Sequence, residues 1–305
     1  MDRTTPSAQQ IESYLADRSN WGRWPDNPSA GTVNLITSSK RLAAIGLVET
    51  GRTVSLSRPL PTEPAPDNPQ PVQQFMKQID FGEGVGAATD YVGIAQHGFV
   101  VTHIDALSHY WGADGMFEGQ DPAEALGFDG AEFGGVEAWR DGILTRGVLL
   151  DVPKHRGGAY VDLDTPVHGW ELEEILSSEG IELEPGDAVV VHSGRERYAA
   201  ANGGVYAPVG RPYPGLHGST LPFFKEHDVG LLVWDMEDAG PNEYDLPVTV
   251  HGAIFAYGLA VVDNALIEPL AEACREMGRY EFMLICAPLF LRGGTGSPVN
   301  PIAVF

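Results

Sequence analysis

The chain has 305 residues, of which 43% are hydrophobic and 20% charged, as is typical of a globular protein with a sizeable core. Its formal net charge of −23 offers no basic surface to nucleic acid, an anionic membrane or a polyanionic substrate, so none of these is expected as a partner. The N-terminus lacks the features of a signal peptide, and the apolar runs are shorter than the roughly 18 residues of a membrane span, which favours a cytoplasmic protein.

Helix signals dominate the first part of the chain, and we expect 1–50 to form an N-terminal helical extension. Ser7 and Gln10 have the spacing of a capping box, which predicts that a helix follows as far as about Asp17. After a loop rich in tryptophan, glycine and proline, 38–51 show a second helical pattern that ends at a glycine.

A proline-rich segment comes next. Residues 53–57 are predicted to form a strand, and six prolines fall within the fourteen residues 58–71. We expect 58–80 to be an irregular excursion rather than a domain linker, because the strand patterns on both sides belong to one sheet.

The remainder alternates apolar strand patterns with helical ones. Strands are predicted at 147–152, 187–193, 229–235, 259–263, 282–287 and 302–305, and helices at 169–180, 195–201, 219–227 and 264–278. This alternation indicates an α/β architecture with a sheet covered on both faces. We expect one domain over 1–305, in which Cys274 and Cys286 are buried thiols rather than a disulfide.

The chemistry concentrates in the stretch HGFVVTHIDALSHYWG, residues 97–112. It lies in an apolar run from about residue 91 that is typical of a buried strand. His103 and Asp105 are two apart, so on a strand they share one face and can reach one cation. Imidazole and carboxylate suit zinc, manganese or iron. His97 and His109 are separated from His103 and Asp105 by even numbers of residues, so on a regular strand they would share the same face.

Two local ligands do not make a tight site, so distant ones are needed. The best candidates are His251 and Asp263, with Asp235 and Glu237 as weaker ones. Each has a simpler interpretation: Asp263 suits the N-cap of the helix at 264–278, and His251 could be a core histidine. His97 could bond a backbone carbonyl. The five remaining histidines are expected to be structural or at the surface: His155, His168, His192, His217 and His227.

The stretch resembles the signature of the metal-dependent cyclase superfamily, which includes bacterial kynurenine formamidase and isatin hydrolase. That signature reads His-x-Gly-Thr-His-x-Asp-x-Pro-x-His, and the matching window here is FVVTHIDALSH. The residues that match are Thr102, His103, Asp105 and His109. The residues that depart are Phe99, Val101 and Leu107. Longer members of the superfamily often read HG…THIDALxH, a pattern that includes His97, and the resemblance continues through most of the chain.

The resemblance implies an α/β domain around a mixed sheet or partial barrel flanked by helices, of the swivelling β/β/α type, in a homodimer or homotetramer. In similar members a distal histidine and a glutamate twelve residues later complete the metal site. His251 and Asp263 are twelve apart here. The shorter aspartate arm, and Phe99 in place of a histidine, put a second metal ion in question. The implied cofactor is zinc or manganese, one or two ions per chain.

The expected activity is metal-dependent hydrolysis of a small amide, cyclic amide or lactone. His109 is the expected general base, since an imidazole with a pKa near 6.5 can take a proton from water and return it to a leaving group. An apolar substrate wall is expected from Trp21, Trp24, Phe99 and Trp111, and His217 is a further pocket candidate.

Three other functions remain open from the sequence. The same site could catalyse ring closure or dehydration in a natural-product pathway. His103, Asp105 and His251 also match the ligand set of a non-haem iron oxygenase. Against it, no Lys or Arg occurs between His251 and Arg275, where a 2-oxoglutarate enzyme needs a basic residue. A non-catalytic metal-binding or small-ligand-binding protein is the third.

Overall fold

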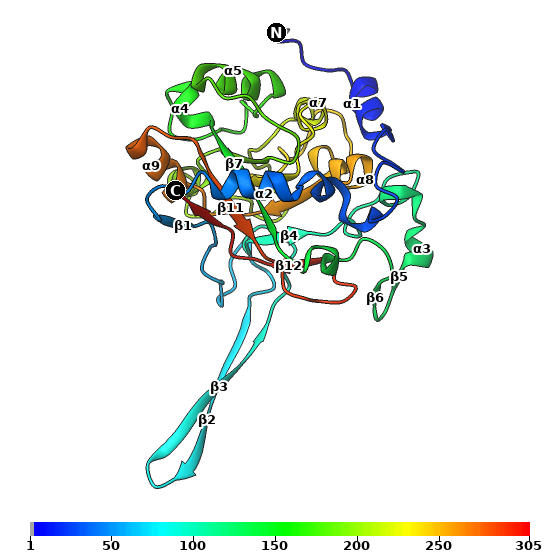
Figure 1. Cartoon of the computed structure of the whole chain (residues 1–305). Coiled ribbons are helices and arrows are strands. Elements are labelled where there is room, and N and C mark those ends of the chain that lie inside the picture. The colour runs from blue at the N-terminus through cyan, green and yellow to red at the C-terminus, as the bar shows by residue number, and fades with distance from the viewer. Residues whose placement is uncertain (1–2) are drawn as a thin grey trace.

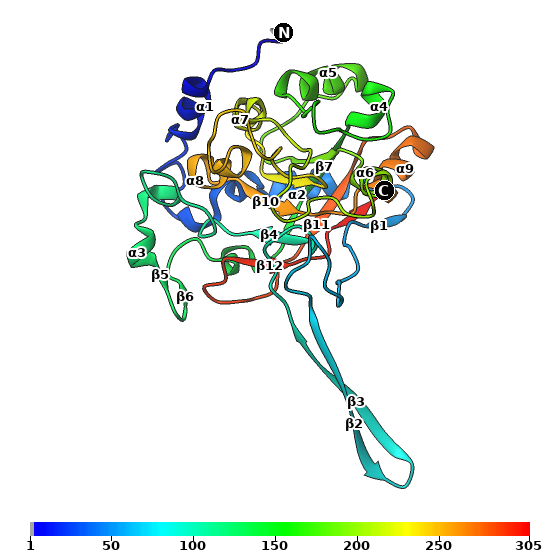
Figure 2. The ribbon, with the colours of Figure 1, turned by 180° about the vertical axis from the view of Figure 1, so that it is seen from behind.

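The computed structural model describes residues 3–305, and Figures 1 and 2 show one long hairpin that projects from the body of the protein. The body is a mixed α/β domain on a curled nine-stranded sheet, which confirms the predicted fold class. The strands of this sheet are β1 Thr53–Ser55, β4 His103–Asp105, β7 Ile143–Asp151, β8 Ala188–His192, β9 Leu231–Trp234, β10 Ala260–Asp263, β11 Glu281–Cys286, β12 Gly296–Pro298 and β13 Ile302–Val304. Their spatial order is β1-β13-β11-β7-β8-β9-β10-β4-β12.

Four central strands are parallel, and the strands toward both edges are antiparallel. β7, β8, β9 and β10 form the parallel part, and their side chains are almost all buried, as expected for strands covered on both faces. β4 pairs antiparallel with β10 on one side and with β12 on the other. The short strand β4 therefore lies between two neighbours that hold it in register.

Helices cover both faces of the sheet and extend along its upper edge (Figure 1). The α-helices are α1 Ala8–Leu15, α2 Ser38–Ile45, α3 Pro122–Ala125, α4 Val152–Arg156, α5 Gly169–Glu179, α6 Arg195–Ala201, α7 Leu221–Glu226, α8 Ala253–Tyr257 and α9 Glu268–Met277. The 3₁₀ helices are η1 Pro28–Leu35, η2 Phe117–Gly119, η3 Val136–Trp139, η4 Gly218–Thr220 and η5 Val250–Gly252. Two separate two-stranded sheets complete the fold: the long hairpin pairs β2 Gln73–Gly82 with β3 Val85–Gly93, and a short one pairs β5 Leu126–Gly127 with β6 Gly130–Ala131.

The N-terminal helices follow their capping signals, with one correction. The Ser7 side chain accepts from the Gln10 backbone N–H while the Gln10 side chain accepts from the Ser7 N–H, so the predicted capping box is present. The second helix was predicted to end at Gly51, but α2 ends at Ile45. The backbone N–H groups of Thr50 and Gly51 instead donate to the carbonyl of Phe305, which ties this segment to the last strand.

Two predictions about residues 58–104 are wrong in part. Residues 58–72 contain no helix or strand, but from Gln73 the expected irregular excursion becomes β2, which pairs with β3. The long strand expected from residue 91 is reduced to the three residues of β4. Within residues 94–102, two carbonyls bond side chains instead of a neighbouring strand: Asn264 Nδ2 donates to Gly98 O at 2.6 Å, and Arg195 donates to Phe99 O.

Both cysteines, Cys274 and Cys286, are buried and free, as predicted. Burial raises the pKa of each thiol to about 12, so both are inert toward thiolate chemistry. Within residues 3–305 no helix has the length and apolar character needed to span a membrane.

Candidate metal centre

Strand β4 carries the centre of the site, and its neighbour β10 supplies a second carboxylate. His103 and Asp105 lie two apart and are both buried. In the antiparallel pairing of β4 with β10, His103 stands directly opposite Asp263. Directly opposed residues on antiparallel strands share a face, with Cβ atoms about 5 Å apart. The strand register thus brings Asp263 to His103, whose Nε2 is 3.7 Å from Asp263 Oδ2.

Four imidazoles surround the fully buried carboxylate of Asp105. Its Oδ1 is 3.0 Å from His97 Nδ1 and 3.2 Å from His103 Nε2. Its Oδ2 is 3.8 Å from His109 Nε2 and 3.9 Å from His251 Nε2. The sequence analysis selected all five of these residues, and the structure brings them together although only two lie on a strand. His97 and His109 reach Asp105 from irregular chain on either side of β4.

His251 joins the cluster from η5, where Asp238 holds its ring. Asp238 accepts from His251 Nδ1, from the Thr249 hydroxyl at 2.6 Å and from the backbone N–H of Val250. His251 Nε2 then points at Asp263 Oδ2, 3.1 Å away. A carboxylate that fixes the far nitrogen of a ligating histidine is typical of metal sites.

Asp263 is not a helix cap. The helix that follows, α9, begins at Glu268 with Ile267 as its N-cap. Asp263 Oδ1 instead accepts from Trp234 Nε1 at 2.5 Å, which leaves Oδ2 directed at His103 and His251. The capping interpretation of Asp263 is therefore wrong.

Hydrogen bonding at this cluster is incomplete in a way that fits a cation. His103 Nδ1 must donate to the Val101 carbonyl, 2.8 Å away, so in the neutral ring Nε2 carries a lone pair. The same holds for His251, whose Nδ1 donates to Asp238. Both oxygens of Asp105 and the Nδ1 of His97 are buried without a hydrogen-bond partner. Lone pairs facing a carboxylate repel unless a positive charge lies between them, so this donor set fits a divalent ion.

The shifted pKa values of His103 and Asp105 also indicate that this cluster favours a positive charge. Burial alone would lower the pKa of His103, yet contact with Asp105 raises it to about 9. Burial likewise opposes the charged form of Asp105, but His103 and His97 hold its pKa well below the usual range. The cluster thus stabilises a negative Asp105 only by attracting a proton or a metal ion.

His109 differs from the two buried histidines of the cluster, His103 and His251. Its side chain is 24% exposed, whereas theirs are 1% and 5% exposed. Its ring stacks on His97 with ring centroids 3.7 Å apart, and it meets the ring of Tyr110 edge-on at 4.5 Å. Burial lowers the pKa of His109 to about 4, so the ring is neutral at pH 7 and able to accept a proton.

A cavity of about 430 Å³ opens beside His251. Its lining includes the rings of Phe99, Tyr110 and Tyr213 and the carboxyl groups of Glu237 and Asp238. Burial raises the pKa of Glu237 to about 8, and the nearby charge of Asp263 adds to this shift. Glu237 Oε1 has no hydrogen-bond partner, so this acid can donate to a polar atom in the cavity.

Of the five predicted pocket residues, Phe99 alone lines this cavity among the described part of the chain. Trp21 packs on Phe117 and donates from Nε1 to the Phe255 carbonyl at 3.1 Å. The other three lie elsewhere: Trp24 against Arg23, Trp111 at the surface with 51% of its area exposed, and His217 in the loop before η4. His217 accepts from the Ser219 N–H and contacts the Tyr244 hydroxyl, so its role in the structure is to cap η4.

Two residues that the sequence analysis did not select are central to the geometry. Asp238 orients His251, and Tyr110 lies between His109 and His251 with ring centroids 4.5 Å and 5.1 Å from them. Asp238 follows strand β9 in the same WDMED stretch as Asp235. Its place just after the end of a strand is the sequence feature that could have identified it as a site residue. Asp235 itself accepts three backbone N–H groups from residues 193–195 and serves the loop rather than the site.

A second buried cluster of histidine and carboxylates lies on the same sheet. His192 Nδ1 bonds Asp151 Oδ1 at 2.9 Å, and its Nε2 bonds Glu268 Oε2 at 3.1 Å. The remaining carboxylate oxygens accept from Arg275 and Arg197, each at 2.8 Å. No side-chain atom of these five residues is among the unsatisfied buried groups of residues 3–305. This cluster is a closed ionic network, in agreement with the structural role predicted for His192.

Fold and site together define an α/β protein with a histidine–carboxylate cluster on its sheet that could hold a metal ion, and comparison with known proteins gives the family. The model of the family described as "Putative cyclase" matches residues 53–239, more than half of the chain. The chain belongs to this cyclase family. Comparison with curated protein sequences gives no match.

Solved structures of other proteins have a similar fold. A crystal structure described as that of a novel cyclase is 30% identical, with a TM-score of 0.81 over 94% of this chain and 99% of the other. An isatin hydrolase bound to the product analogue thioisatinate is 16% identical, with a TM-score of 0.57 over 88% of this chain and 98% of the other. Isatin hydrolase A from Ralstonia solanacearum is 18% identical, with a TM-score of 0.56 over the same shares. The two hydrolases share the fold of this chain.

Proposed function

We propose that this protein is a metal-dependent hydrolase of a small amide, cyclic amide or lactone. The observation that carries the proposal is the unsatisfied Asp105 carboxylate, faced by the Nε2 atoms of His103 and His251. The proposed ligands are His97, His103, Asp105, His251 and Asp263, in two groups that share Asp105. Nitrogen and oxygen donors of this kind suit zinc or manganese, and two groups can hold one or two ions.

A bound divalent ion supplies two kinds of chemistry: it lowers the pKa of water toward neutrality, and it polarises a carbonyl group. The residues supply proton transfer and orientation. His109 is neutral, partly exposed and within 4 Å of the ligand Asp105, so it is placed to take the proton of an attacking water. It then returns that proton to the leaving nitrogen or oxygen.

The cavity beside His251 is the proposed substrate site. Phe99, Tyr110 and Tyr213 give it aromatic walls, which favours a substrate with a flat or apolar ring. A neutral Glu237 can donate a hydrogen bond to the substrate. Because the cavity volume is about 430 Å³, it suits a small molecule rather than a polymer.

Two of the similar structures support hydrolysis as the reaction class. Both are described as isatin hydrolases, and one holds a product analogue. The family description instead refers to cyclisation, and ring closure by loss of water uses the same proton transfers in reverse. The assay should therefore follow both the opening and the closing of a ring.

The test combines metal content with turnover. Elemental analysis by mass spectrometry should find at least one divalent ion per chain in the purified protein. The His103→Ala variant should lose this ion. His155→Ala is the matched control, because His155 pairs with Glu174 and belongs to neither candidate ligand group. Stripped protein should regain hydrolysis of a panel of linear amides, cyclic amides and lactones on addition of zinc or manganese. Full activity of metal-free protein would refute the proposal.

The oxygenase alternative is decided in the same assay. His103, Asp105 and His251 converge as that alternative requires, but Asp263 and His97 lie close enough to add a second carboxylate and a third imidazole. We expect turnover under anaerobic conditions and without 2-oxoglutarate. A strict requirement for oxygen would favour the iron enzyme.

A further inference from the structure

The cavity beside His251 is lined by acids and, within the described part of the chain, by no lysine or arginine. The acids are Glu237, Asp238 and Asp245. Asp238 is already engaged, because it accepts from His251 Nδ1. The other two differ in depth: Asp245 is exposed, whereas Glu237 is only 8% exposed. One acid therefore lies at the open side of the cavity and the other at its buried end.

Glu237, the buried acid, lacks a hydrogen-bonded partner. Its Oε1 is buried and makes no hydrogen bond to any of residues 3–305. The charge of Arg195 acts on Glu237, but the guanidinium donates to the carbonyls of Phe99 and Asp235 instead. A buried carboxyl in this state retains its proton, and burial raises the pKa of Glu237 to about 8. The carboxyl is therefore open to a partner from outside the chain.

Three aromatic rings line the same cavity. Phe99, Tyr110 and Tyr213 are each partly exposed, so part of every ring faces open space. The rings of Phe99 and Tyr213 lie 5.0 Å apart between centroids and are inclined by 59°, so they form a corner rather than a stack. The face of an aromatic ring carries partial negative charge and attracts a cation within about 6 Å of its centroid. Rings and carboxyl together favour a ligand that is both apolar and positively charged.

We propose that the substrate carries a positively charged amine beside its ring, and that Glu237 is the residue that selects it. This inference rests on the proposed function, since it concerns the substrate of the same hydrolase. An ammonium group donates to Glu237, which ionises beside it and accepts instead of donating. An anionic substrate would meet only acids along the cavity wall. The net charge of −23 further attracts cations from solution.

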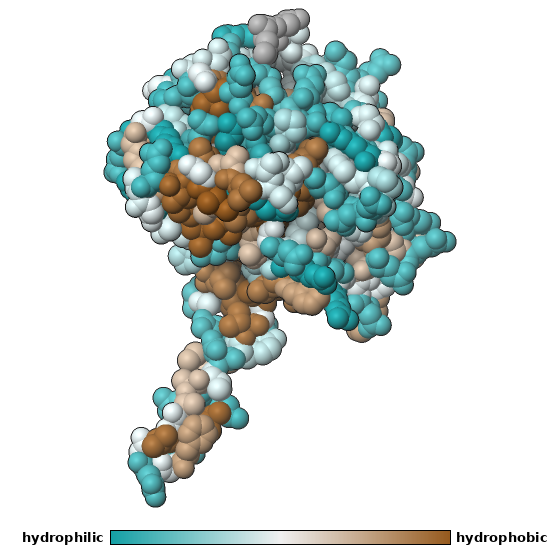
Figure 3. Space-filling model, viewed as in Figure 1, coloured by the Kyte–Doolittle hydropathy of each residue, from teal (hydrophilic) through white to brown (hydrophobic). Residues whose placement is uncertain are grey.

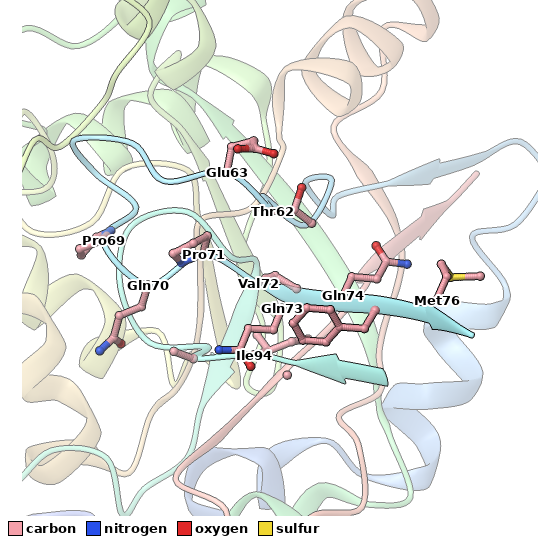
Figure 4. Close-up of a pocket in the computed structure, with 13 residues that line it drawn as sticks. Thr62, Glu63, Pro69, Gln70, Pro71, Val72, Gln73, Gln74, Met76 and Ile94 are labelled. Atoms are coloured by element: carbon pink, nitrogen blue, oxygen red, sulfur yellow. The ribbon is translucent and has the colours of Figure 1, made fainter. Parts of the chain in front are cut away.

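Another hollow supplies a matched control on the same chain. It encloses about 1,040 Å³ at the root of the hairpin of β2 and β3, and Figure 4 shows Glu63 on its wall. Glu63 is exposed, so water solvates its carboxylate and a cation gains little there. Glu63→Gln therefore makes the same chemical change as Glu237→Gln without removing a buried acid.

Apolar surface elsewhere calls for a neutral probe as well. Figure 3 shows apolar side chains gathered on one face of the body, over α2 and again near the root of the hairpin. An aromatic probe can adsorb to such a surface through its ring alone. Benzyl alcohol has the ring of benzylammonium but no charge, so the difference in affinity between the two reports the charge alone.

Calorimetric titration of the purified protein measures this difference without turnover. Wild-type protein should bind benzylammonium at least about tenfold more tightly than benzyl alcohol, as expected for a hydrogen bond to a charged group. Glu237→Gln should lose most of this preference and still bind benzyl alcohol like the wild type, whereas Glu63→Gln should keep the preference. Benzyltrimethylammonium, which has no lone pair for a metal ion, should depend on Glu237 in the same direction.

Two results would overturn the proposal. Equal affinity of wild-type protein for benzylammonium and benzyl alcohol would refute the cation preference, and this result requires no variant to fold. A Glu237→Gln variant that binds benzyl alcohol normally and keeps the preference would show that Glu237 does not select the charge.

Turnover separates this inference from the proposed function. Metal-loaded protein is assayed with acetanilide and with 4-(aminomethyl)acetanilide, and kcat/KM should be at least about tenfold higher for the amine. Equal kcat/KM values for the two would refute the cation preference while hydrolysis stands. Hydrolysis of no substrate, together with an intact preference for benzylammonium, would refute the proposed function and leave the cation site.

Discussion

His192 and His103 are buried imidazoles beside carboxylates on one sheet, yet their surroundings differ in kind. Around His192 both ring nitrogens and all four carboxylate oxygens have partners, and two arginines complete the network. Around His103 the Asp105 oxygens have none. A cluster that serves stability satisfies its own polar atoms, whereas one that serves binding leaves them for a ligand. This difference, rather than the presence of histidine and acid, marks the functional site.

The largest expected effect separates the two clusters by metal content. Asp105→Asn removes the carboxylate shared by both ligand groups, so we expect the divalent ion and the hydrolytic activity to be lost together. Asp151→Asn makes the same chemical change in the closed network and should leave metal content unchanged. Elemental analysis of both variants, purified in parallel, measures the contrast. Equal metal content in the two would erase the distinction.

The next effect tests the division of labour within the site. His109→Gln should lower kcat by about 10²–10⁴-fold, the usual contribution of a general acid–base, while the metal stays bound. Elemental analysis and steady-state kinetics on the same preparation separate the two properties. Loss of metal in step with activity would make His109 a ligand instead.

A smaller effect is expected from the residue that orients a ligand. Asp238→Asn keeps the shape of the side chain but weakens its hold on His251 Nδ1, and loss of a group that orients a ligating histidine costs about 10–100-fold in metal affinity. Competition with a chelator measures the affinity. Asp235→Asn is the control, because Asp235 lies three residues earlier and bonds only loop N–H groups. Equal affinities in the two variants would remove Asp238 from the site.

The smallest effect is a pH dependence of stability in the closed network. Burial opposes the charge on His192, but Asp151 and Glu268 raise its pKa to about 10 from 6.5. Its contribution is thus complete below pH 6.5 and is lost as the pH rises toward 10. The pKa values of Asp151 and Glu268, both lowered to about 2, remove the contribution again in acid below about pH 4.5.

The melting temperature of His192→Gln should therefore fall furthest below that of the wild type between about pH 4.5 and 6.5, by several degrees. The gap should close toward pH 10. A gap that widened with rising pH would show that His192 is neutral in the folded protein.

The sequence predicts much of the site because short-range spacing carries part of the geometry. His103 and Asp105 share a face through the two-residue period of a strand, and the apolar runs of β7, β8 and β9 identify buried parallel strands. The position of Asp263 depends on strand register, which pairs it with His103 and has no local signal. Its place as a charged residue at the end of an apolar strand made Asp263 a candidate ligand, and the family resemblance, with an acid twelve residues after the distal histidine, favoured a ligand over a helix cap.

Other features depend on contacts between distant segments. The strand expected from residue 91 forms only at His103–Asp105, and before it the carbonyls of Gly98 and Phe99 bond Asn264 and Arg195, far along the chain. A sequence does not distinguish a tryptophan that lines a pocket from one that packs in the core, and Trp21 packs against Phe117. The hairpin of β2 and β3 was not predicted. The prolines at 58–71 made the segment before it read as irregular chain, and β2 and β3 pair with each other rather than with the main sheet.

The central claim is that the unsatisfied oxygens of Asp105 face a metal ion. A crystal structure of protein soaked in zinc or manganese, with anomalous data on both sides of the absorption edge, tests it most directly. The account predicts an anomalous peak about 2.0–2.2 Å from His103 Nε2 and from an Asp105 oxygen, and none at His192. An anomalous map with no peak at Asp105, or with the ion bound in the closed network, would contradict it.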